Sequence, residues 1–442
     1  MSDSYRISQI MRVSFQTLGC RLNQFESDAL AAQFIAKGWT TVEFHEEADV
    51  YVINTCTVTN KSDRKSRNTI HHPLRQRPES LVVVTGCYTE SSRKVLENEP
   101  GIGLVVPNQQ KNLLVSLVEA RLQGELPEEL SGESGTKYLG NVFDYPVLPR
   151  VFHTRASIKV QDGCDNFCSF CIIPQVRGRA QSRPLVEIFE EASQLINNGV
   201  KELVLTGVNI GRYDDGGRQL DDVIKKLLEI PGEWRLRLSS LEPDGLPENF
   251  AELFLHPKMV PHLHLCLQSA SDRVLLAMRR QYTYEDYKNL VTLLRKKVPG
   301  FQFTTDLIVG FPGETDEEFQ QTCQAIRDFQ FSHVHIFKYS RRAGTRADRM
   351  DEQIPETLKS ERSHILHEKV EAQKLAILNT WVGKTQRVLI EKFTSGPARG
   401  LGEHYLPVIL ETEVAQNEFV TTQITGVKRL DGELVLVGLP LN

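Results

Sequence analysis

Three cysteines lie within eight residues of the segment QDGCDNFCSFCIIP, and their spacing suits the holding of metal. Cys164, Cys168 and Cys171 form a C-x3-C-x2-C pattern directly after the predicted strand ASIKVQ. A [4Fe–4S] cluster normally takes four cysteines, so a cluster held by three keeps one iron open for a substrate. Zinc is the alternative. Structural zinc is closed by four ligands, and the nearest histidine, His153, lies eleven residues before Cys164.

Three further cysteines follow predicted strands at distant points of the chain. Cys20, Cys56 and Cys87 end the segments TLGC, NTC and TGC. In a parallel sheet the C-terminal ends of neighbouring strands lie along one edge, about 5 Å apart, where ligands bind in open α/β sheets. We expect the three thiols to meet there, the alternative being three buried small side chains. Cys266 and Cys323, on an apolar strand and in a helix, are predicted to serve packing.

The bulk composition indicates a cytoplasmic protein of several domains. A chain of 442 residues exceeds one ordinary core, and 40% hydrophobic with 25% charged residues is an average soluble composition. The sequence has no run of eighteen apolar residues and no apolar leader, so we expect neither export nor a membrane partner. The net charge of −5 excludes a general nucleic-acid coat protein but permits local basic patches.

The order of predicted elements indicates an α/β protein with three domains. Residues 11–120 alternate apolar strands (VSFQT, DVYVINT, LVVVTG, IGLVVPN) with helices such as FESDALAAQFIAKGW, which is typical of an open parallel α/β domain. Residues 121–150 are rich in Gly, Pro and Glu and are predicted to be a linker.

Residues 151–378 contain six predicted strands separated by helices: ASIKVQ, KELVLTG, WRLRLSS, HLHLCLQ, FQFTTDLIVG and HVHIFKY. Six units are too few for a closed eight-stranded TIM barrel, so we expect a partial (β/α)6 barrel with its reactive groups at the C-terminal ends of the strands. Residues 379–442 contain short strands split by Gly and Asp turns, which predict a five-stranded β-barrel of about sixty residues.

Four residues at the predicted strand ends are candidates for cofactor binding. Gly207 and Asn209 lie in TGVNIG, Gly310 lies in VGFPGET, and Gln268 lies in LQS. Glycines at such positions let the backbone approach a ligand closely. Ordinary strand-to-helix turns are the alternative for both glycine segments, and a structural role is the alternative for the glutamine.

The segment CDNFCSFC resembles the signature of the radical S-adenosylmethionine (SAM) enzymes. The wider chain resembles one branch of them, the methylthiotransferases, through TLGCRLNQFESD, VINTCTVT, VTGCY, CIIPQVRGRAQSR, LVLTGVNIG, LQSASDRVL and DLIVGFPGET. The resemblance implies a three-cysteine N-terminal domain, a radical SAM barrel and a small C-terminal β-barrel called TRAM.

The resemblance also implies two [4Fe–4S] clusters and SAM as cofactors. Cys164, Cys168 and Cys171 match the ligands of the radical cluster, whose open iron chelates SAM before its cleavage to a 5′-deoxyadenosyl radical. Cys20, Cys56 and Cys87 match those of an auxiliary cluster that holds the sulfur to be inserted. An electron donor, such as a flavodoxin or ferredoxin, and a sulfur donor are the implied protein partners. No other residue is assigned a catalytic role.

The family modifies three kinds of substrate: isopentenyladenosine in tRNA, threonylcarbamoyladenosine in tRNA, and an aspartate of a ribosomal protein. The stretch GCRLNQ resembles the threonylcarbamoyladenosine type. The implied function is therefore methylthio insertion at C2 of N6-threonylcarbamoyladenosine at position 37, beside the anticodon. The other two substrates are alternatives, as is a non-catalytic, metal-dependent RNA-binding module.

Three basic runs give independent support for tRNA as a partner. Residues 61–77 hold six Lys and Arg against one Asp, and RGRAQSR and RRAGTRADR are two shorter runs. Such side chains supply affinity for phosphate without sequence choice, although a solvated surface is the alternative for each. From Leu378 onward there are six Lys and Arg against seven Asp and Glu, so we expect the C-terminal barrel to grip RNA only locally.

Overall fold

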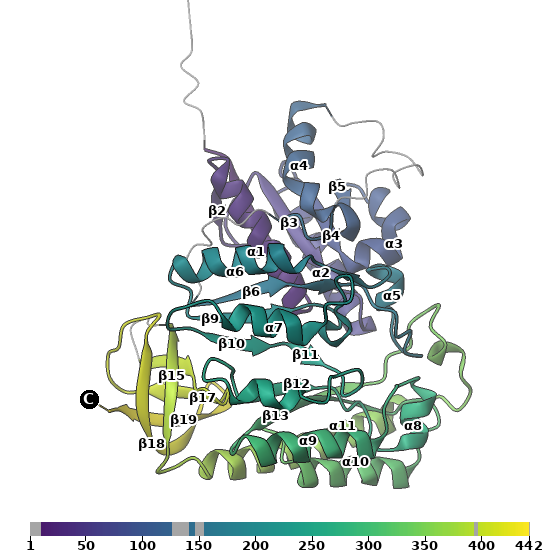
Figure 1. Cartoon of the computed structure of the whole chain (residues 1–442). Coiled ribbons are helices and arrows are strands. Elements are labelled where there is room, and N and C mark those ends of the chain that lie inside the picture. Colours follow the sequence, from purple (N-terminus) through teal and green to yellow (C-terminus); the bar gives the residue numbers. More distant parts are fainter. Residues whose placement is uncertain (1–9, 126–140, 146–153, 393–396, 442) are drawn as a thin grey trace, which may run out of the picture. The chain divides into compact units, whose positions relative to one another are not determined.

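The computed structural model describes residues 10–125, 141–145, 154–392 and 397–441, which divide into two compact units (Figure 1). Unit 1 is Met1–Val151 with two short later segments, Asp162–Cys164 and Cys171–Arg179. Unit 2 is Phe152–Gln161, Asp165–Phe170 and Ala180–Asn442. Within the described ranges, no helix is long and apolar enough to cross a membrane.

Unit 1 is built on a five-stranded parallel sheet in the order β2-β1-β3-β4-β5. The strands are β1 (Arg12–Thr17), β2 (Thr40–Val42), β3 (Val50–Thr55), β4 (Leu81–Gly86) and β5 (Ile102–Val106). This confirms the open parallel sheet. The short edge strand β2 escaped prediction because two of its three residues are exposed threonines, which leave no apolar pattern.

Helices cover both faces of this sheet, and β3 and β4 are therefore buried along nearly their whole length. They are α1 (Arg21–Ala36), α2 (Asn60–Gln76), α3 (Cys87–Glu97), the 3-10 helix η1 (Asn108–Leu113), α4 (Leu114–Gln123) and α5 (Ile173–Val176). Val52 and Val83 pack with α1 and α4 residues on one face, while Ile53 and Val84 belong to the core of the other face.

The predicted linker, residues 121–150, lies largely outside the described residues. Where its ends are described, α4 continues to Gln123 and is closed by Gly124 at φ 77°. Tyr145 is buried in unit 1, and its ring meets that of Phe25 edge-on at a centroid distance of 5.8 Å. The domain boundaries drawn from the sequence stay a prediction.

Unit 2 contains the partial barrel, with all six predicted strands present and parallel. The strands form one sheet in the order β10-β9-β6 and a second sheet in the order β11-β12-β13-β14. A parallel bridge joins Leu236, in β10, to Met259, which precedes β12. The strands are β6 (Arg155–Lys159), β9 (Glu202–Thr206), β10 (Arg235–Leu238), β12 (His262–Leu265), β13 (Gln302–Val309) and β14 (His333–Lys338); β7 (Gln161–Asp162), β8 (Gln181–Ser182) and β11 (Ser240–Leu241) have two residues each.

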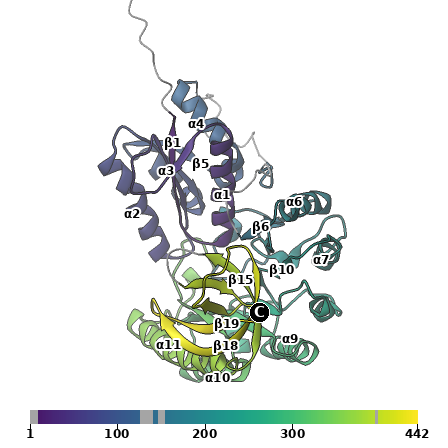
Figure 2. The ribbon, with the colours of Figure 1, turned by 90° about the vertical axis from the view of Figure 1, so that its left-hand side faces the viewer.

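Helices line the outer side of these strands, as Figure 2 shows for α6, α7 and α9. The helices are α6 (Leu185–Asn197), α7 (Leu220–Leu228), α8 (Asp272–Ala277), α9 (Tyr284–Lys297), α10 (Asp316–Phe329) and α11 (Glu356–Asn379), with 3-10 turns η4 (Ile210–Arg212), η5 (Phe250–Leu255) and η6 (Ala347–Arg349). Alternate strand residues such as Leu203, Leu205, Phe303 and Leu307 form the core beneath them.

The C-terminal strands form a closed five-stranded barrel, as predicted. The strands are β15 (Thr385–Lys392), β16 (Ala398–Leu401), β17 (Pro407–Leu410), β18 (Phe419–Leu430) and β19 (Glu433–Pro440). The strand β16 had no apolar run to reveal it: its sequence is ARGL. It exists because both of its neighbours, β15 and β17, supply antiparallel hydrogen bonds.

The small barrel packs against the start of the strands of the partial barrel. Arg155 Nε lies 2.7 Å from Glu391 Oε1. The guanidinium of Arg237 lies 3.6 Å from the centre of the Tyr405 ring, which is the geometry of a cation–π contact. Arg155 is the first residue of β6, and Arg235, whose Nη2 donates to the carbonyl oxygen of Leu401 in β16 at 3.2 Å, is the first residue of β10. The end of the barrel opposite the predicted reactive rim is therefore the one that the C-terminal domain covers.

A buried carboxylate holds this end together. Glu202 accepts hydrogen bonds of 2.6 Å from Arg235 and from Arg237. Burial by itself raises the pKa of Glu202, but the guanidiniums of Arg237 and Arg235 outweigh burial and lower this pKa to about 2. The stabilisation is therefore present at neutral pH and is lost as the pH falls from about 4.3, the ordinary glutamate pKa, toward 2.

We expect Glu202→Gln to lower the free energy of unfolding by about 3–5 kcal/mol, because it leaves buried guanidiniums without a counter-charge. Urea unfolding followed by tryptophan fluorescence measures the change. Glu229→Gln is the control, since Glu229 pairs with Lys226 at the surface, and such pairs contribute about 1 kcal/mol or less. Equal unfolding midpoints for the two variants would contradict the structural role of Glu202.

Candidate metal centres and cofactor site

The structure gathers Cys20, Cys56 and Cys87 at one edge of the unit 1 sheet. They follow β1, β3 and β4, which are neighbours in the sheet, and the pairs Thr17–Asn54 and Thr55–Gly86 bring the strand ends level. Burial raises the pKa of Cys56 most, and the neighbouring thiols of Cys87 and Cys20 raise this pKa further, so the three thiols are close enough to interact electrostatically. All eight cysteines of the chain are free thiols.

Two glycines explain how the strand ends can come so close. Gly19 has φ 95°, and a Cβ atom there would lie 2.8 Å from Cys56 Cβ. Gly86 has φ 97°, and a Cβ atom there would lie 2.3 Å from the carbonyl oxygen of Thr55. Each glycine directly precedes a cysteine of the trio. Any other residue type would both strain the backbone and push the thiols apart.

Asn23, from the stretch GCRLNQ, ties two of the cysteine turns together. Its amide nitrogen donates to the carbonyl oxygens of Leu18, at 2.8 Å, and Thr55, at 2.9 Å. These residues lie just before Cys20 and Cys56. Asn23 therefore has a structural role: it joins the turns that carry Cys20 and Cys56.

The surroundings of the trio suit negatively charged thiolates. Burial raises the pKa of the Cys87 thiol, whereas the Arg177 guanidinium and the Lys111 ammonium lower it. Asn108 Nδ2 donates to Cys87 Sγ at 3.7 Å. Cys20 is the N-cap residue of α1 and Cys87 is the first residue of α3, and helix N-termini stabilise thiolates. This donor set fits a cubane held at three corners, whose irons would remove the thiol protons.

The second cysteine segment forms a loop without regular structure between β7 and α5. The N–H of Cys164 donates to the carbonyl oxygen of Gly178 at 3.1 Å. Arg280 Nη1 lies 3.2 Å from Cys168 Sγ. Burial raises the pKa of Cys168, and Arg280 lowers it. A cationic donor to a ligand sulfur stabilises the thiolate form and tunes a bound cluster.

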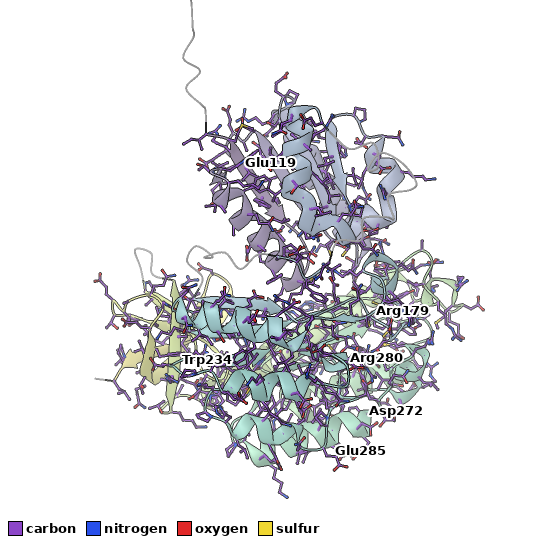
Figure 3. All side chains as sticks on the ribbon, turned by 45° about the horizontal axis from the view of Figure 1, so that its top comes forward. Glu119, Arg179, Trp234, Asp272, Arg280 and Glu285 are labelled. Atoms are coloured by element: carbon purple, nitrogen blue, oxygen red, sulfur yellow. The ribbon has the colours of Figure 1, made fainter. Side chains whose placement is uncertain are left out.

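Arg280, labelled in Figure 3, is itself held in place. Its Nη2 lies 2.8 Å from Glu242 Oε1, and Glu242 also accepts 2.6 Å from Asn166, inside the cysteine loop. Sequence reasoning missed both residues of this pair. Glu242 follows a predicted strand, so the strand-end rule could have found it. Arg280 lies in an ordinary basic stretch, MRRQY, and gives no comparable signal.

Gly207 and Asn209 lie where they were expected, immediately after β9. A Cβ atom on Gly207 would lie 2.8 Å from the carbonyl oxygen of Gln161. The backbone N–H of Asn209 donates to Gln161 Oε1 at 2.8 Å. Its side-chain nitrogen is buried without a hydrogen-bond partner, a donor that a bound cofactor could use.

Gln268 and Gly310 follow β12 and β13, which are adjacent strands of the same rim. Gln268 has φ 67°, an uncommon value for a non-glycine residue. Gly310 has φ 71°, and a Cβ atom there would lie 2.3 Å from Cγ of Lys359 on α11. The chain's own packing thus already requires a glycine at 310. The structure brings all four residues to strand ends, and their binding of a cofactor stays a prediction.

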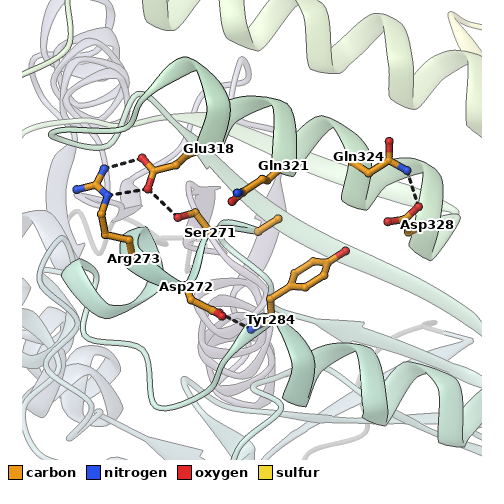
Figure 4. Close-up of a pocket in the computed structure, with 9 residues that line it drawn as sticks. Ser271, Asp272, Arg273, Tyr284, Glu318, Gln321, Gln324 and Asp328 are labelled. Atoms are coloured by element: carbon orange, nitrogen blue, oxygen red, sulfur yellow. Dashed lines mark hydrogen bonds and ion pairs between the residues drawn. The ribbon is translucent and has the colours of Figure 1, made fainter.

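A pocket of about 590 Å³ lies elsewhere in unit 2, among α8, α9 and α10 (Figure 4). Glu318 accepts hydrogen bonds from Ser271 and Arg273, Tyr284 N–H donates to Asp272, and these groups cap or join helices. None of the predicted site residues lines this pocket. Its polar groups serve the helix ends, so we do not place the active site there.

Cys266 and Cys323 are buried, Cys323 in the core of unit 2, in agreement with their predicted packing roles.

The basic runs differ in what they expose. In RGRAQSR, Arg177 and Arg183 are buried and paired with carboxylates, which leaves them unavailable to phosphate, whereas Arg179 is exposed. In residues 61–77, which form most of α2, the exposed side chains include Lys61, Arg64 and Lys65 on one face of the helix. This face of α2 therefore presents three exposed basic side chains in unit 1.

Comparisons with known proteins agree with this arrangement. Residues 158–326 match the Radical SAM superfamily, and residues 12–107 match the Uncharacterized protein family UPF0004. The chain is 41% identical over 360 residues to the threonylcarbamoyladenosine tRNA methylthiotransferase MtaB of Bacillus subtilis, covering 80% of this chain and 79% of that protein. It is 34% identical over 437 residues to a tRNA-2-methylthio-N(6)-dimethylallyladenosine synthase of Cereibacter sphaeroides, covering 95% and 97%.

A solved structure shares the fold. The radical S-adenosylmethionine methyltransferase TsrM of Kitasatospora setae superimposes with a TM-score of 0.56 at 16% identity, covering 76% of this chain and 77% of that one.

The barrel, the cysteine loop and the superfamily match define a radical SAM protein. Within that class, the chain belongs to the methylthiotransferase family, as its relatives over most of its length show. Proteins of this family use SAM and carry two [4Fe–4S] clusters, and the chain offers one set of three thiols for each.

Proposed function

We propose that this protein is a tRNA methylthiotransferase that inserts a methylthio group at C2 of N6-threonylcarbamoyladenosine, at position 37 beside the anticodon. The observation that carries the proposal is the convergence of Cys20, Cys56 and Cys87 at one sheet edge, in a chain that also has the radical SAM loop. The named function of the Bacillus subtilis relative supports the choice of substrate, as does the stretch GCRLNQ.

The chemistry requires a radical because the C2–H bond of adenine offers neither an acidic proton nor a leaving group. When bound, the cluster with SAM would supply a 5′-deoxyadenosyl radical to remove this hydrogen, the auxiliary cluster would supply the sulfur, and a second SAM would supply the methyl group. In the proposal, Cys164, Cys168 and Cys171 hold the first cluster, and Arg280 donates to Cys168.

The remaining roles belong to the rim and to partner proteins. Gly207, Asn209, Gln268 and Gly310 are proposed to border the SAM site, where the free side-chain amide of Asn209 offers a donor. The reaction also needs electrons and sulfur, so we propose a flavodoxin or ferredoxin as reductant and a sulfur donor as further partners. The proposed place of action is the cytoplasm, where tRNA is modified.

The function is tested by analysing tRNA nucleosides from a strain that lacks the gene. We expect 2-methylthio-threonylcarbamoyladenosine to disappear and its unmodified precursor to accumulate, while 2-methylthio-isopentenyladenosine is unchanged. Complementation with the intact gene should restore the product. Loss of the isopentenyl product, or of a methylthio group on a ribosomal protein, would assign one of the alternative substrates. No change in any of them, in an organism without a second enzyme, would overturn the proposal.

The basic face of α2 is proposed to contact tRNA phosphates. Replacing Lys61, Arg64 and Lys65 together by Ala should weaken tRNA binding and reduce the slope of log Kd against log salt by about 2–3, because each lost phosphate contact removes about 0.7–0.9 from the slope. Filter binding across a salt series measures this slope. Lys225→Ala with Lys226→Ala on α7 is the control, since these lysines pair with Asp221 and Glu229. An unchanged slope in the α2 variant would contradict the proposed surface.

A further inference from the structure

Arg177 is a buried arginine whose side chain contacts three side chains in unit 1. Its Nη1 lies 3.0 Å from Glu26 Oε1 and 3.0 Å from both carboxylate oxygens of Asp162. Its Nη2 lies 2.7 Å from Asn23 Oδ1 and 3.2 Å from Glu26 Oε2. Only 2% of the Arg177 side chain and 3% of the Glu26 side chain are exposed. These charged hydrogen bonds, made by both terminal nitrogens, fix the orientation of the guanidinium.

Arg177 and its partners come from both flanks of the cysteine loop and from α1. Asp162 lies two residues before Cys164, and Arg177 lies six residues after Cys171. Asn23 and Glu26 lie in the first two turns of α1, the helix that Cys20 caps. One side chain therefore joins the two flanks of the radical SAM loop to the helix that carries an auxiliary cysteine.

The backbone around this clamp is equally constrained. A Cβ atom on Gly163 would lie 2.0 Å from the carbonyl oxygen of Arg179. The N–H of Cys164 donates to Gly178, one residue beyond Arg177. Beside them, Ile172 and Val176 pack with Cys87 of the trio. The flanks of the loop are thus held together and lie directly on the auxiliary site.

Lys111 extends the clamp beneath the auxiliary cysteines. Its Nζ lies 2.6 Å from Glu26 Oε2 and 3.3 Å from Asn54 Oδ1, and its side chain is fully buried. Asn54 Nδ2 in turn donates to the backbone oxygen of Asn23 at 2.9 Å. Two cations and two carboxylates, those of Glu26 and Asp162, balance in charge. Such a group resists displacement because removing one member leaves a buried charge uncompensated.

We propose that Arg177 is a positioning residue that fixes the radical cluster relative to the auxiliary cluster, by clamping both ends of the 164–171 loop to α1. The inference rests on the proposed function, in which the radical and the sulfur must reach the same carbon. Correct placement of two reacting groups is worth orders of magnitude in rate, and a displacement of about 1 Å costs about 100-fold.

The test compares Arg177→Met with Arg183→Met. Arg183 is a buried arginine of the same basic run, but it pairs with Glu187 and Glu191 in unit 2. Both variants should lose thermal stability and retain their iron. Only Arg177→Met should change the magnetic dipolar interaction between the two reduced clusters in electron paramagnetic resonance. Only it should lower the methylthiolated product formed per 5′-deoxyadenosine, by about 10- to 100-fold. Arg177→Lys, which keeps one cation, should recover part of both.

An unchanged dipolar interaction and unchanged coupling in an iron-replete Arg177→Met would overturn the proposal. If Arg177→Met loses iron, Glu26→Gln removes one arm of the clamp and carries the same expectations. The dipolar measurement needs no tRNA. Failure of the intact protein to modify threonylcarbamoyladenosine would therefore refute the proposed function without deciding the role of Arg177.

Discussion

Cys56→Ala is expected to abolish methylthio insertion while SAM cleavage continues. Cys56 lies in the trio of unit 1, where Cys20 and Cys87 are its electrostatic neighbours. Two cysteines cannot retain a cubane that three thiolates hold, so the sulfur source is lost. The 164–171 loop keeps all its thiols, so the radical should still form. Anaerobic assays that measure 5′-deoxyadenosine and methylthiolated nucleoside separately check this expectation.

The matched control is Cys323→Ala, which removes a buried thiol from the core of unit 2. It should lower stability modestly and leave both products unchanged, because Cys323 lies in neither trio. Full methylthiolation by Cys56→Ala would show that the trio of unit 1 does not hold the auxiliary cluster.

Cys168→Ala is expected to abolish both products. Cys168 receives the hydrogen bond from Arg280 and belongs to the loop that matches the radical SAM superfamily. Without the radical cluster no SAM is cleaved, and the auxiliary cluster then has no activated carbon to receive its sulfur. The iron content should fall by about half, to about four per chain, because the trio of unit 1 is intact. The same assay, with an iron determination, measures all three quantities.

Residual SAM cleavage by Cys168→Ala at the rate of the intact protein would contradict the assignment of the loop. The two cysteine variants together separate the two sites. Cys56→Ala should still form 5′-deoxyadenosine without the methylthiolated nucleoside, whereas Cys168→Ala should form neither.

The sequence predicted the parts of this protein that follow local rules. Cys20, Cys56 and Cys87 each follow an apolar β-branched run, and parallel strands bring their C-terminal ends to one edge whatever the loops between them contain. The six strands of the partial barrel were likewise visible as apolar runs separated by helices. The small barrel was predicted from the spacing of its turns.

The remaining features depend on contacts between distant residues, which leave no local pattern. Arg177 belongs to a run that resembles an RNA-binding patch, yet it is buried against Glu26, which lies 151 residues earlier in the chain. Gly310 suggested a ligand, but the close approach of Lys359 from α11 already requires it. Arg280 reaches Cys168 over 112 residues. The sequence does not show whether a charged residue will be exposed or buried against a partner of opposite charge.

Each of the two sets of three thiolates is proposed to hold one cubane. Iron and sulfide determination with Mössbauer spectroscopy, on anaerobically reconstituted protein, tests this proposal most directly. Two cubanes give about eight irons and eight sulfides per chain, all in [4Fe–4S] form. About four irons per chain, or zinc in place of iron at either trio, would contradict it.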